Sequence, residues 1–239
     1  TRILTTGAGG VRVWDATTGK NTLTLTTRDT DSGAWSPDGA HILTTGHSGG
    51  QVWDATTGHN THGVGIGRFP SGAWSPDGAH ILTTGHNGAM VWDSTGRIVN
   101  KLTTEHTGPS VWSPDGARIL TAGDHGVLVW DAISGRRVCT LTSAYAEGGA
   151  WTPDGSRILT TGPHGARQWD AETGKPIGVI IEPLPEGEVV VRDAVTEEVL
   201  GASPGAWRWL GYAAMIDGQM TRLPAELYGP LPPLKQAGS

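Results

Sequence analysis

The hydrophobic and polar positions of this chain repeat with a regular period. A short apolar segment that ends in tryptophan is followed by a Ser/Thr-Pro-Asp-Gly turn, a run such as His-Ile-Leu-Thr-Thr, a glycine-rich turn, and a run that ends in Trp-Asp. The leading tryptophans recur at a nearly constant interval, at Trp35, Trp74, Trp112 and Trp151. A period of this length is typical of folds built from one repeated supersecondary unit.

Each repeat predicts four β-strands. The first is short and apolar, which favours a fully buried inner strand. The turn that follows has proline where φ must be fixed and negative and glycine where φ is expected to be positive, as hairpins require. The second strand alternates isoleucine, leucine and threonine, and the third ends in Trp-Asp. The fourth strand varies most, as a strand at the outer edge can, and we place it at 61–66, 98–102, 138–141 and 177–181.

Both ends of the chain depart from the pattern. Residues 1–27 enter in the middle of a repeat, so three strands are expected there instead of four. Beyond residue 181 the period is lost, and we interpret 186–223 as a divergent terminal repeat. In the alternative interpretation, residues 205–212 cross over and supply the missing inner strand of the first repeat. The Pro-rich tail, 224–239, is expected to lie outside the fold.

Composition narrows the class of protein further. Threonine and glycine dominate the polar positions, which favours strands and turns, so the fold class is all-β. The formal net charge is −6 and the pI about 5.8, which argues against a nucleic-acid partner. The single cysteine, Cys139, is expected to be a small buried hydrophobe, and the absence of a disulfide framework predicts a cytoplasmic location. No apolar run approaches the ~20 residues needed to span a membrane.

The Ser-Pro-Asp-Gly turn, the strand after it and the Val-Trp-Asp-Ala-Thr-Thr-Gly ending together resemble the WD-repeat β-propeller. The resemblance covers residues 1–181. It implies four-stranded antiparallel blades around a central channel, with six blades in this chain, the last one divergent, in a single domain over 1–223. In that family the Trp-Asp pairs are structural; here they are Trp14, Trp53, Trp92, Trp130 and Trp169 with Asp15, Asp54, Asp93, Asp131 and Asp170.

A second resemblance is carried by the segment Gly-Ala-Ser-Pro-Gly-Ala-Trp-Arg-Trp-Leu-Gly-Tyr at 201–212. It is similar to the end of propeller domains in bacterial multidomain signalling and defence proteins. The resemblance implies a C-terminal scaffold or sensor domain without enzymatic activity. Its partner would be another protein or upstream domains of the same chain, and a homodimer through the incomplete first blade is a further expectation.

The repeats also depart from the family pattern. The usual Gly-His pair before the inner strand is missing, and the turn before the Trp strand is one residue short. We therefore expect the blades to be held mainly by packing of Trp, Leu, Ile and Val, and not by the family's polar network.

Histidines recur in the glycine-rich turns at a constant interval, at His47, His86, His125 and His164. Equivalent loops on neighbouring blades are more than ~10 Å apart, which is too far for shared zinc coordination. We expect each histidine to cap its own turn, and no metal or cofactor is predicted. If one face binds a partner, it is the face of these turns, which also carries Arg28, Arg68, Phe69, His106 and Tyr145.

Three other constellations have simpler interpretations. Residues 46–50 match the Gly-x-Ser-x-Gly pattern of hydrolases, but that pattern needs a strand-to-helix turn, and later repeats replace Ser48. The aspartates of the Pro-Asp-Gly turns, Asp38, Asp77, Asp115 and Asp154, are expected to bond their own backbone rather than calcium. Trp207 and Trp209 are interpreted as part of ring closure. No catalytic residue is predicted.

Two alternative functions remain open. The Ala-Trp-Ser-Pro-Asp-Gly segment also resembles repeats of TolB-like and peptidase-associated propellers, which implies a peptide or small ligand in the central channel. A sugar-binding propeller would need exposed aromatics that recur between blades, and Phe69 and Tyr145 are too irregular for that.

Overall fold

The structure is a computed structural model of the 239-residue chain. It describes residues 1–7, 10–27, 30–65, 67, 69, 71–85, 88–102, 107–123, 126–142, 147–162, 165–216, 219–224 and 231–234. The described residues are almost entirely strands and turns, so the predicted all-β class is confirmed. The chain forms two compact units, Thr1–Gly155 and Ser156–Ser239, whereas the sequence led us to expect one domain over 1–223.

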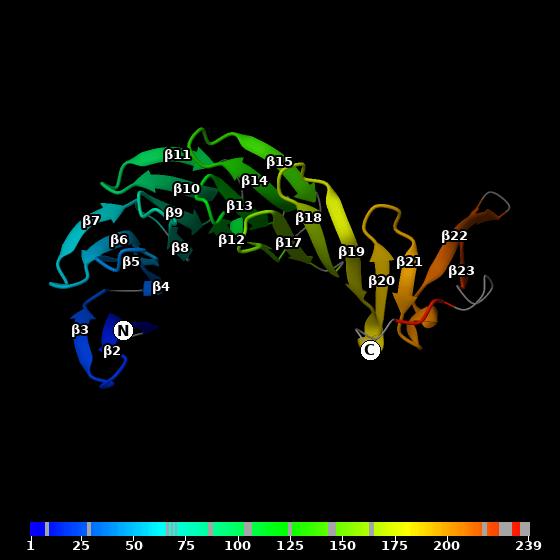
Figure 1. The fold of residues 1–239 in the computed structure, drawn as a ribbon, viewed down its shortest axis with the longest axis horizontal. Helices are drawn as coiled ribbons and strands as arrows, with labels where there is room; N and C mark the ends of the chain where they lie inside the picture. Colours follow the sequence, from blue (N-terminus) through cyan, green and yellow to red (C-terminus); the bar gives the residue numbers. More distant parts are fainter. Residues whose placement is uncertain are drawn as a thin grey trace. The chain divides into compact units, whose positions relative to one another are not determined.

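The first unit is a series of antiparallel sheets in chain order (Figure 1). The first sheet has three strands, β1 (Arg2–Gly7), β2 (Gly10–Asp15) and β3 (Asn21–Leu25). The second has four, β4 (Thr30–Trp35), β5 (His41–Gly46), β6 (Gly49–Asp54) and β7 (Asn60–Val64). The third has four, β8 (Ser71–Trp74), β9 (His80–Gly85), β10 (Gly88–Asp93) and β11 (Ile98–Leu102). The last complete sheet has β12 (Thr107–Trp112), β13 (Arg118–Gly123), β14 (Gly126–Asp131) and β15 (Arg137–Thr142), and β16 (Gly148–Trp151) follows it.

Successive sheets of the first unit pack against each other through their inner strands. β1 lies against β4, β4 against β8, β9 against β12, and β12 against β16. One apolar cluster joins Val11, Val13 and Leu25 of the first sheet to Ile42 and Ala55 of the second. Matching clusters join the second sheet to the third and the third to the fourth. The periodic Leu, Ile, Val and Trp positions of the sequence are therefore the core of the unit.

The second unit contains a sheet of consecutive antiparallel strands. They are β17 (Arg157–Gly162), β18 (Gly165–Asp170), β19 (Pro176–Pro183), β20 (Val189–Asp193) and β21 (Val199–Ala202). A 3-10 turn at Pro185–Gly187 separates β19 from β20, and a second 3-10 helix, Ala206–Arg208, precedes a hairpin of β22 (Gly211–Ile216) and β23 (Gln219–Pro224).

This arrangement differs from the divergent four-stranded blade expected over 186–223. β20 pairs with β19, so β20 and β21 extend the sheet that contains β17, β18 and β19. Residues 206–208 are helical, whereas the Gly-Ala-Trp segments of the regular repeats are strands. The hairpin of β22 and β23 pairs with no other strand in the described part of the chain. The sequence copy of Gly-Ala-Trp was therefore a misleading signal for an inner strand.

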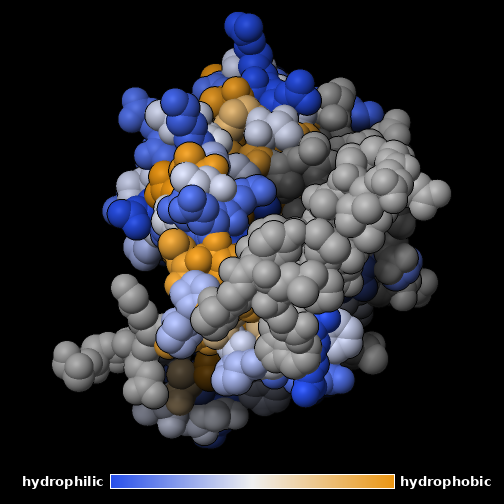
Figure 2. All heavy atoms as spheres, turned by 90° about the vertical axis from the view of Figure 1, so that its right-hand side faces the viewer, coloured by the Kyte–Doolittle hydropathy of each residue, from blue (hydrophilic) through white to orange (hydrophobic). Residues whose placement is uncertain are grey.

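Hydrophobic side chains also reach the surface of the second unit. Val195 is 73% exposed, and Ile181 and Leu159 are 49% and 45% exposed. Figure 2 shows hydrophobic surface beside hydrophilic surface on the face turned to the viewer. Among the described residues, fewer positions are buried in this unit than in the first. Its apolar cluster of Val190, Ala202, Ala206 and Leu210 includes the start of the second 3-10 helix.

Candidate functional site

One end of each regular sheet is closed by the Ser-Pro-Asp-Gly turn. The Ser36 hydroxyl donates to Asp38 Oδ1 (2.6 Å) and accepts the His41 backbone N–H (2.8 Å), and Asp38 Oδ1 accepts the Ala40 N–H (2.9 Å). Gly39 has φ 69°, which glycine adopts without strain. The same set recurs at Ser75 and Ser113. Hydrogen bonds, that of the Ser36 hydroxyl first, hold the pKa of Asp38 below its usual value.

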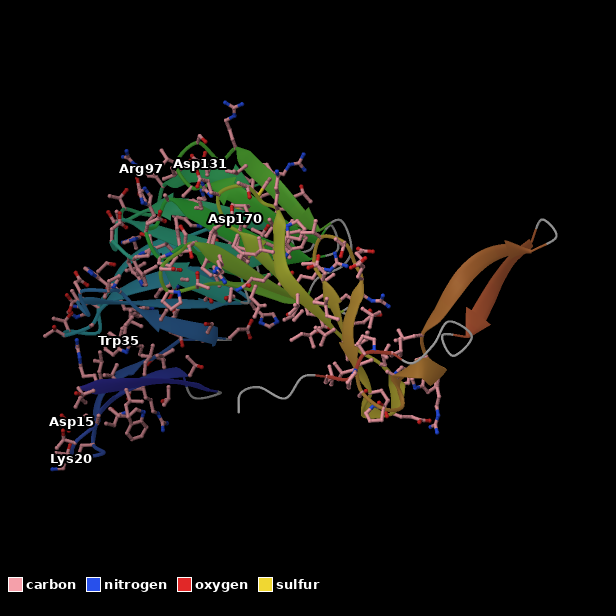
Figure 3. The ribbon with its side chains drawn as sticks, turned by 45° about the vertical axis from the view of Figure 1, so that its right-hand side comes forward. Asp15, Lys20, Trp35, Arg97, Asp131 and Asp170 are labelled. Atoms are coloured by element: carbon pink, nitrogen blue, oxygen red, sulfur yellow. The ribbon has the colours of Figure 1, made fainter. Side chains whose placement is uncertain are left out.

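The same end carries the closing turn after each Trp-Asp pair. Asp15 Oδ1 accepts the backbone N–H of Thr18 (2.7 Å) and Thr17 (3.0 Å) and the Thr18 hydroxyl (2.8 Å). These bonds, first of all the Thr18 backbone N–H, lower the pKa of Asp15. Asp131 and Asp170 do the same for Ser134 and Thr173 (Figure 3). The aspartates are therefore turn-forming groups at this end of each sheet.

The tryptophan of each pair is bonded inside its own sheet. Each indole Nε1–H donates to a threonine hydroxyl nine residues earlier in the chain, at 2.8–2.9 Å. The pairs are Trp14–Thr5, Trp53–Thr44, Trp92–Thr83, Trp130–Thr121 and Trp169–Thr160. The apolar packing expected to hold the blades is therefore supplemented by a tryptophan–hydroxyl bond in each of these five sheets.

The Gly-His turn closes the opposite end of the second sheet. Gly46 pairs with Gly49, so His47 and Ser48 form a two-residue connection between β5 and β6, and both side chains are exposed. Gly49 has φ 114°, which only glycine adopts readily. His47 Nδ1 lies 3.7 Å from Asp31 Oδ2, with side-chain exposures of 53% and 32%. Such an exposed pair contributes little stability.

A pocket of about 350 Å³ lies beside this turn, between the first and second sheets. Its lining consists of uncharged hydroxyl, amide and backbone groups: Thr26, Thr27, Thr30, Thr44, Thr45, Gly46, Ser48, Gly49 and Gln51. The Thr45 hydroxyl is buried and has no hydrogen-bond partner among the described residues. The lining offers only neutral donors and acceptors, so the pocket suits a neutral polar group.

We use the name Gly-His face for Asp31, His47, Ser48 and the lining of this pocket. Of the residues predicted to contact a partner, only His47 and Phe69 lie in the described part of the chain. The others, Arg28, Arg68, His86, His106, His125, Tyr145 and His164, lie outside the described residues.

Phe69 is 3% exposed and packs edge-on against Trp92, with ring centroids 6.4 Å apart. Its backbone N–H donates to the Gly46 carbonyl (3.0 Å). The ring is therefore part of the core, contrary to its expected place on the partner face, and the backbone of Phe69 ties the loop before β8 to the Gly-His turn.

The glycine pairs of the turns fix the register of the regular sheets. Gly46–Gly49, Gly85–Gly88, Gly123–Gly126 and Gly162–Gly165 are equivalent pairs. In the sequence, His47 and His86 directly follow the first glycine of their pair, whereas His125 and His164 come one residue later. The constant spacing of the histidines therefore coincides with a repeat that is one residue shorter between His86 and His125.

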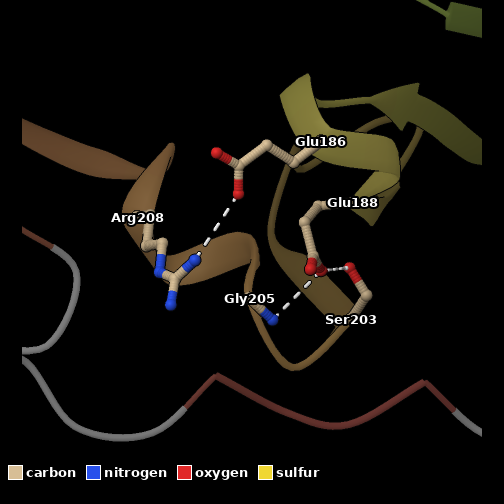
Figure 4. A network of polar contacts seen from close by, with 5 residues as sticks. All are labelled: Glu186, Glu188, Ser203, Gly205 and Arg208. Carbon is tan, nitrogen blue, oxygen red and sulfur yellow. Dashed lines mark hydrogen bonds and ion pairs between the residues drawn. The ribbon is translucent and has the colours of Figure 1, made fainter.

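A separate polar network lies in the second unit (Figure 4). The Ser203 hydroxyl and the Gly205 N–H (3.0 Å) both donate to Glu188, and the Val189 N–H donates to Ser203 Oγ (2.8 Å). Arg208 Nη1 lies 3.5 Å from Glu186 Oε2. The carboxylate of Glu188 satisfies the backbone where β21 leads into the 3-10 helix, so the network stabilises this connection.

Sequence reasoning missed three of these features. A hydroxyl residue, serine three times and threonine once, precedes each proline of the Pro-Asp-Gly turns, and this signal could have revealed the side-chain bond to aspartate. The threonine nine residues before each tryptophan is equally regular. The closing turn also has a copy at Asp193, with Glu197 at φ 60° where the regular repeats have glycine. Because no tryptophan precedes Asp193, the sequence pattern does not reveal this copy.

The described residues form neither the hydrolase turn that the Gly-x-Ser-x-Gly match suggests nor a metal-binding group. Ser48 lies in a strand-to-strand turn, which is not the geometry of a hydrolase nucleophile. No group of three or more His, Cys, Asp or Glu side chains in the described ranges could hold a metal ion. None of the helices described is long and apolar enough to cross a membrane.

A comparison with protein families matches residues 96–131 to the WD domain, G-beta repeat. The matched segment runs from the closing turn of the third sheet through β14. A comparison with curated proteins found no match. The family match falls on the part of the repeat that carries the Ser-Pro-Asp-Gly turn and the Trp-Asp pair.

Proposed function

This chain carries WD repeats of the kind that form β-propeller blades, and we propose that it is a non-catalytic scaffold or sensor that binds a protein partner through the Gly-His face. WD repeats generally mediate contacts between proteins. The proposal further assigns this contact to one surface of the chain, the Gly-His face. The observation that carries it is the neutral pocket of hydroxyl, amide and backbone groups beside the Gly-His turn.

The chemistry of the pocket favours a peptide as its occupant. Threonine and serine hydroxyls and the Gln51 amide both donate and accept hydrogen bonds, as peptide groups and uncharged polar side chains do. The exposed Asp31–His47 pair lies next to this neutral surface and can bond to the rim of a partner. A hydrogen-bonding surface with a small charged rim resembles the make-up of transient interfaces between proteins.

The biological setting is a further part of the proposal. We propose that the partner belongs to a bacterial signalling or regulatory system in the cytoplasm, either as a separate protein or as other domains of the same polypeptide. The support is the resemblance of residues 201–212 to the end of propeller domains in such proteins. A homodimer through the edge strand β1 is the competing proposal for the partner, since β1 pairs only with β2 among the described strands.

Site-specific photo-crosslinking tests the proposed surface. A photoreactive residue is placed at Ser48 in the Gly-His turn or, as the matched control, at Thr56 in the closing turn of the same sheet; both positions are exposed. We expect adducts with a partner protein from Ser48 and few from Thr56. Equal yields at the two positions, or adducts only from Thr56, would contradict the proposal. Adducts of twice the mass of the chain would identify a second copy as the partner.

A further inference from the structure

The described part of the Pro-rich tail, residues 231–234, lies against the second unit, although its composition predicts a segment outside the fold (Figure 1). The Ala202 N–H donates to the Pro232 carbonyl (2.7 Å), and Ala202 and Pro233 form a parallel bridge. Ala202 is the last residue of β21, and β21 is the edge strand of its sheet. The tail therefore meets this edge and runs in the same direction as β21.

A leucine anchors the tail in an apolar cluster. Leu231 is partly buried and packs against the buried residues Val190, Ala202, Ala206 and Leu210. Val190 belongs to β20, and Ala206 begins the second 3-10 helix. The sheet and the helix thus form the anchoring site together, and none of its buried residues comes from the tail itself.

A glycine makes room for the second half of the segment. A Cβ atom on Gly201 would lie 3.2 Å from both Leu234 Cα and the Pro233 carbonyl oxygen. It would also lie 3.3 Å from Leu234 Cδ2. Carbon atoms pack best at about 3.5–4.0 Å, so a side chain here would push the tail away. The φ of Gly201 is outside the left-handed region, so the backbone of β21 does not itself require glycine at this position.

The sequence of the segment, Leu-Pro-Pro-Leu, suits this edge. Pro232 and Pro233 have no backbone N–H, so they offer carbonyl acceptors without leaving a donor unpaired. Leu231 and Leu234 are three residues apart, which is the period of a polyproline II helix and puts both on one side of it. Both leucines contact the fold, one at the cluster and one at Gly201. Such a segment loses little conformational freedom when it binds.

The tail is nevertheless held by few interactions. In the described residues, a single backbone hydrogen bond joins it to β21, whereas β20 is paired with β21 over most of that strand. Pro232, Pro233 and Leu234 are exposed. Segments with little buried apolar surface and exposed backbone bonds open at a low cost in free energy. The site beneath the tail can therefore become accessible while the sheet of the second unit stays folded.

We propose that the site formed by Ala202, Gly201 and the apolar cluster binds a Leu-Pro-Pro-Leu-type segment of a partner protein, and that the tail is its intramolecular competitor. The partner segment places its first leucine in the cluster, accepts the Ala202 N–H with the next carbonyl, and passes its second leucine over Gly201. A segment of the same chain competes at an effective concentration on the order of millimolar, so a partner needs further contacts to displace the tail. The site includes no residue of the Gly-His face.

The probe for this proposal is the peptide acetyl-Leu-Pro-Pro-Leu-amide, and the protein is the full chain with its own tail weakened by Leu231→Ser and Leu234→Ser. The readout is the NMR resonance of the Ala202 backbone N–H. We expect the peptide to shift this resonance saturably in the double variant. Because the attached tail occupies the site, binding to the wild-type chain should be at least about ten-fold weaker. The control peptide acetyl-Ser-Pro-Pro-Ser-amide should cause no shift.

Substitutions of Gly201 in the same double variant supply matched controls. Gly201→Ala should weaken peptide binding and Gly201→Val should abolish it, since both add atoms where Pro233 and Leu234 lie. The Ala variant adds a single methyl group, so it keeps the test valid if the Val variant does not fold.

Four results would overturn the proposal. Equal binding by the wild-type chain and the double variant, or full binding by Gly201→Val, would show that the peptide binds elsewhere. No shift with the peptide would mean that the site accepts only the attached tail. A wild-type dimer that is lost in the double variant would identify the tail of a second copy as the occupant. None of these measurements depends on a partner at the Gly-His face.

Discussion

The turns at the two ends of the regular sheets are stabilised differently. At one end, aspartates and serines satisfy the turn backbone in repeat after repeat, as at Ser36–Asp38 and at Asp54. At the other end, the described Gly-His turn relies on glycine conformations, and one nearby hydroxyl, that of Thr45, is without a partner among the described residues. One end therefore contributes to stability, and the other is the end that we propose binds a partner.

Removal of a serine at the well-bonded end should have the largest effect on stability. Ser113 is 3% exposed, accepts the Arg118 N–H (2.8 Å) and donates to Asp115 (2.6 Å). Ser113→Ala should lower the free energy of unfolding by about 2 kcal/mol, because it removes the buried hydroxyl that accepts the Arg118 N–H and donates to Asp115. Ser48→Ala, at the other end, should change it by less than about 0.5 kcal/mol. Urea unfolding measures both, and equal losses would remove the distinction between the ends.

The Trp92–Thr83 hydrogen bond lies in the interior of a sheet, so its removal measures the contribution of the core to stability apart from that of the turns. Thr83 is fully buried and accepts the Trp92 indole N–H (2.8 Å). Thr83→Val keeps the shape and leaves the indole donor unpaired, so we expect a loss of about 1–2 kcal/mol. Thr5→Val is the control, because the Trp14–Thr5 bond is exposed and water can replace the threonine. Thermal unfolding of the two variants should show a clear drop in Tm only for Thr83→Val.

Acid should weaken the end that is rich in aspartate. Hydrogen bonds lower the pKa values of Asp38, Asp77 and Asp115 below the usual 3.8 in the folded chain. Their contribution is complete above the unfolded pKa and is lost as the pH falls through the folded values. The urea midpoint should therefore drop between about pH 5 and about pH 3. In Asp115→Asn the drop should be smaller; an unchanged pH dependence would argue against a role for these carboxylates.

The smallest effect on stability is expected at the Gly-His face. Asp31→Asn changes an exposed carboxylate that lies 3.7 Å from the His47 ring and should alter the free energy of unfolding by less than about 0.5 kcal/mol. Chemical denaturation would measure this, and a loss well above that value would mean that the pair stabilises the fold, which the exposure of both side chains argues against.

The period of the sequence was enough to predict the regular sheets. Each hairpin combines local signals: proline and glycine at fixed turn positions, alternating Ile-Leu-Thr strands, and a terminal Trp-Asp pair. Because all these signals lie within a single repeat and agree with each other, they need no knowledge of distant contacts. The apolar positions of β5, β9 and β13 are buried as the pattern predicts.

The terminal region and the candidate sites could not be predicted in the same way. Residues 205–207 copy the Gly-Ala-Trp of the inner strands, yet 206–208 form a 3-10 helix next to Glu188. The tertiary setting decides the conformation of so short a segment. The pocket at Thr45 depends on Thr26 and Thr27, which follow the last strand of the preceding sheet. It arises between repeats, where a single repeat carries no signal.

The most direct test of the account measures, by calorimetry, the affinity for the crosslinked partner. Two variants are compared, each with an arginine introduced at a different end of the second sheet. Ser48→Arg places a large charged side chain at the wall of the neutral pocket, whereas Thr56→Arg changes the exposed surface of the closing turn and keeps the backbone bond to Asp54. We predict binding at least about ten-fold weaker for Ser48→Arg, a change of about 1.4 kcal/mol, and unchanged binding for Thr56→Arg. Unchanged binding by Ser48→Arg together with a loss in Thr56→Arg would contradict the account and would assign the partner to the opposite end.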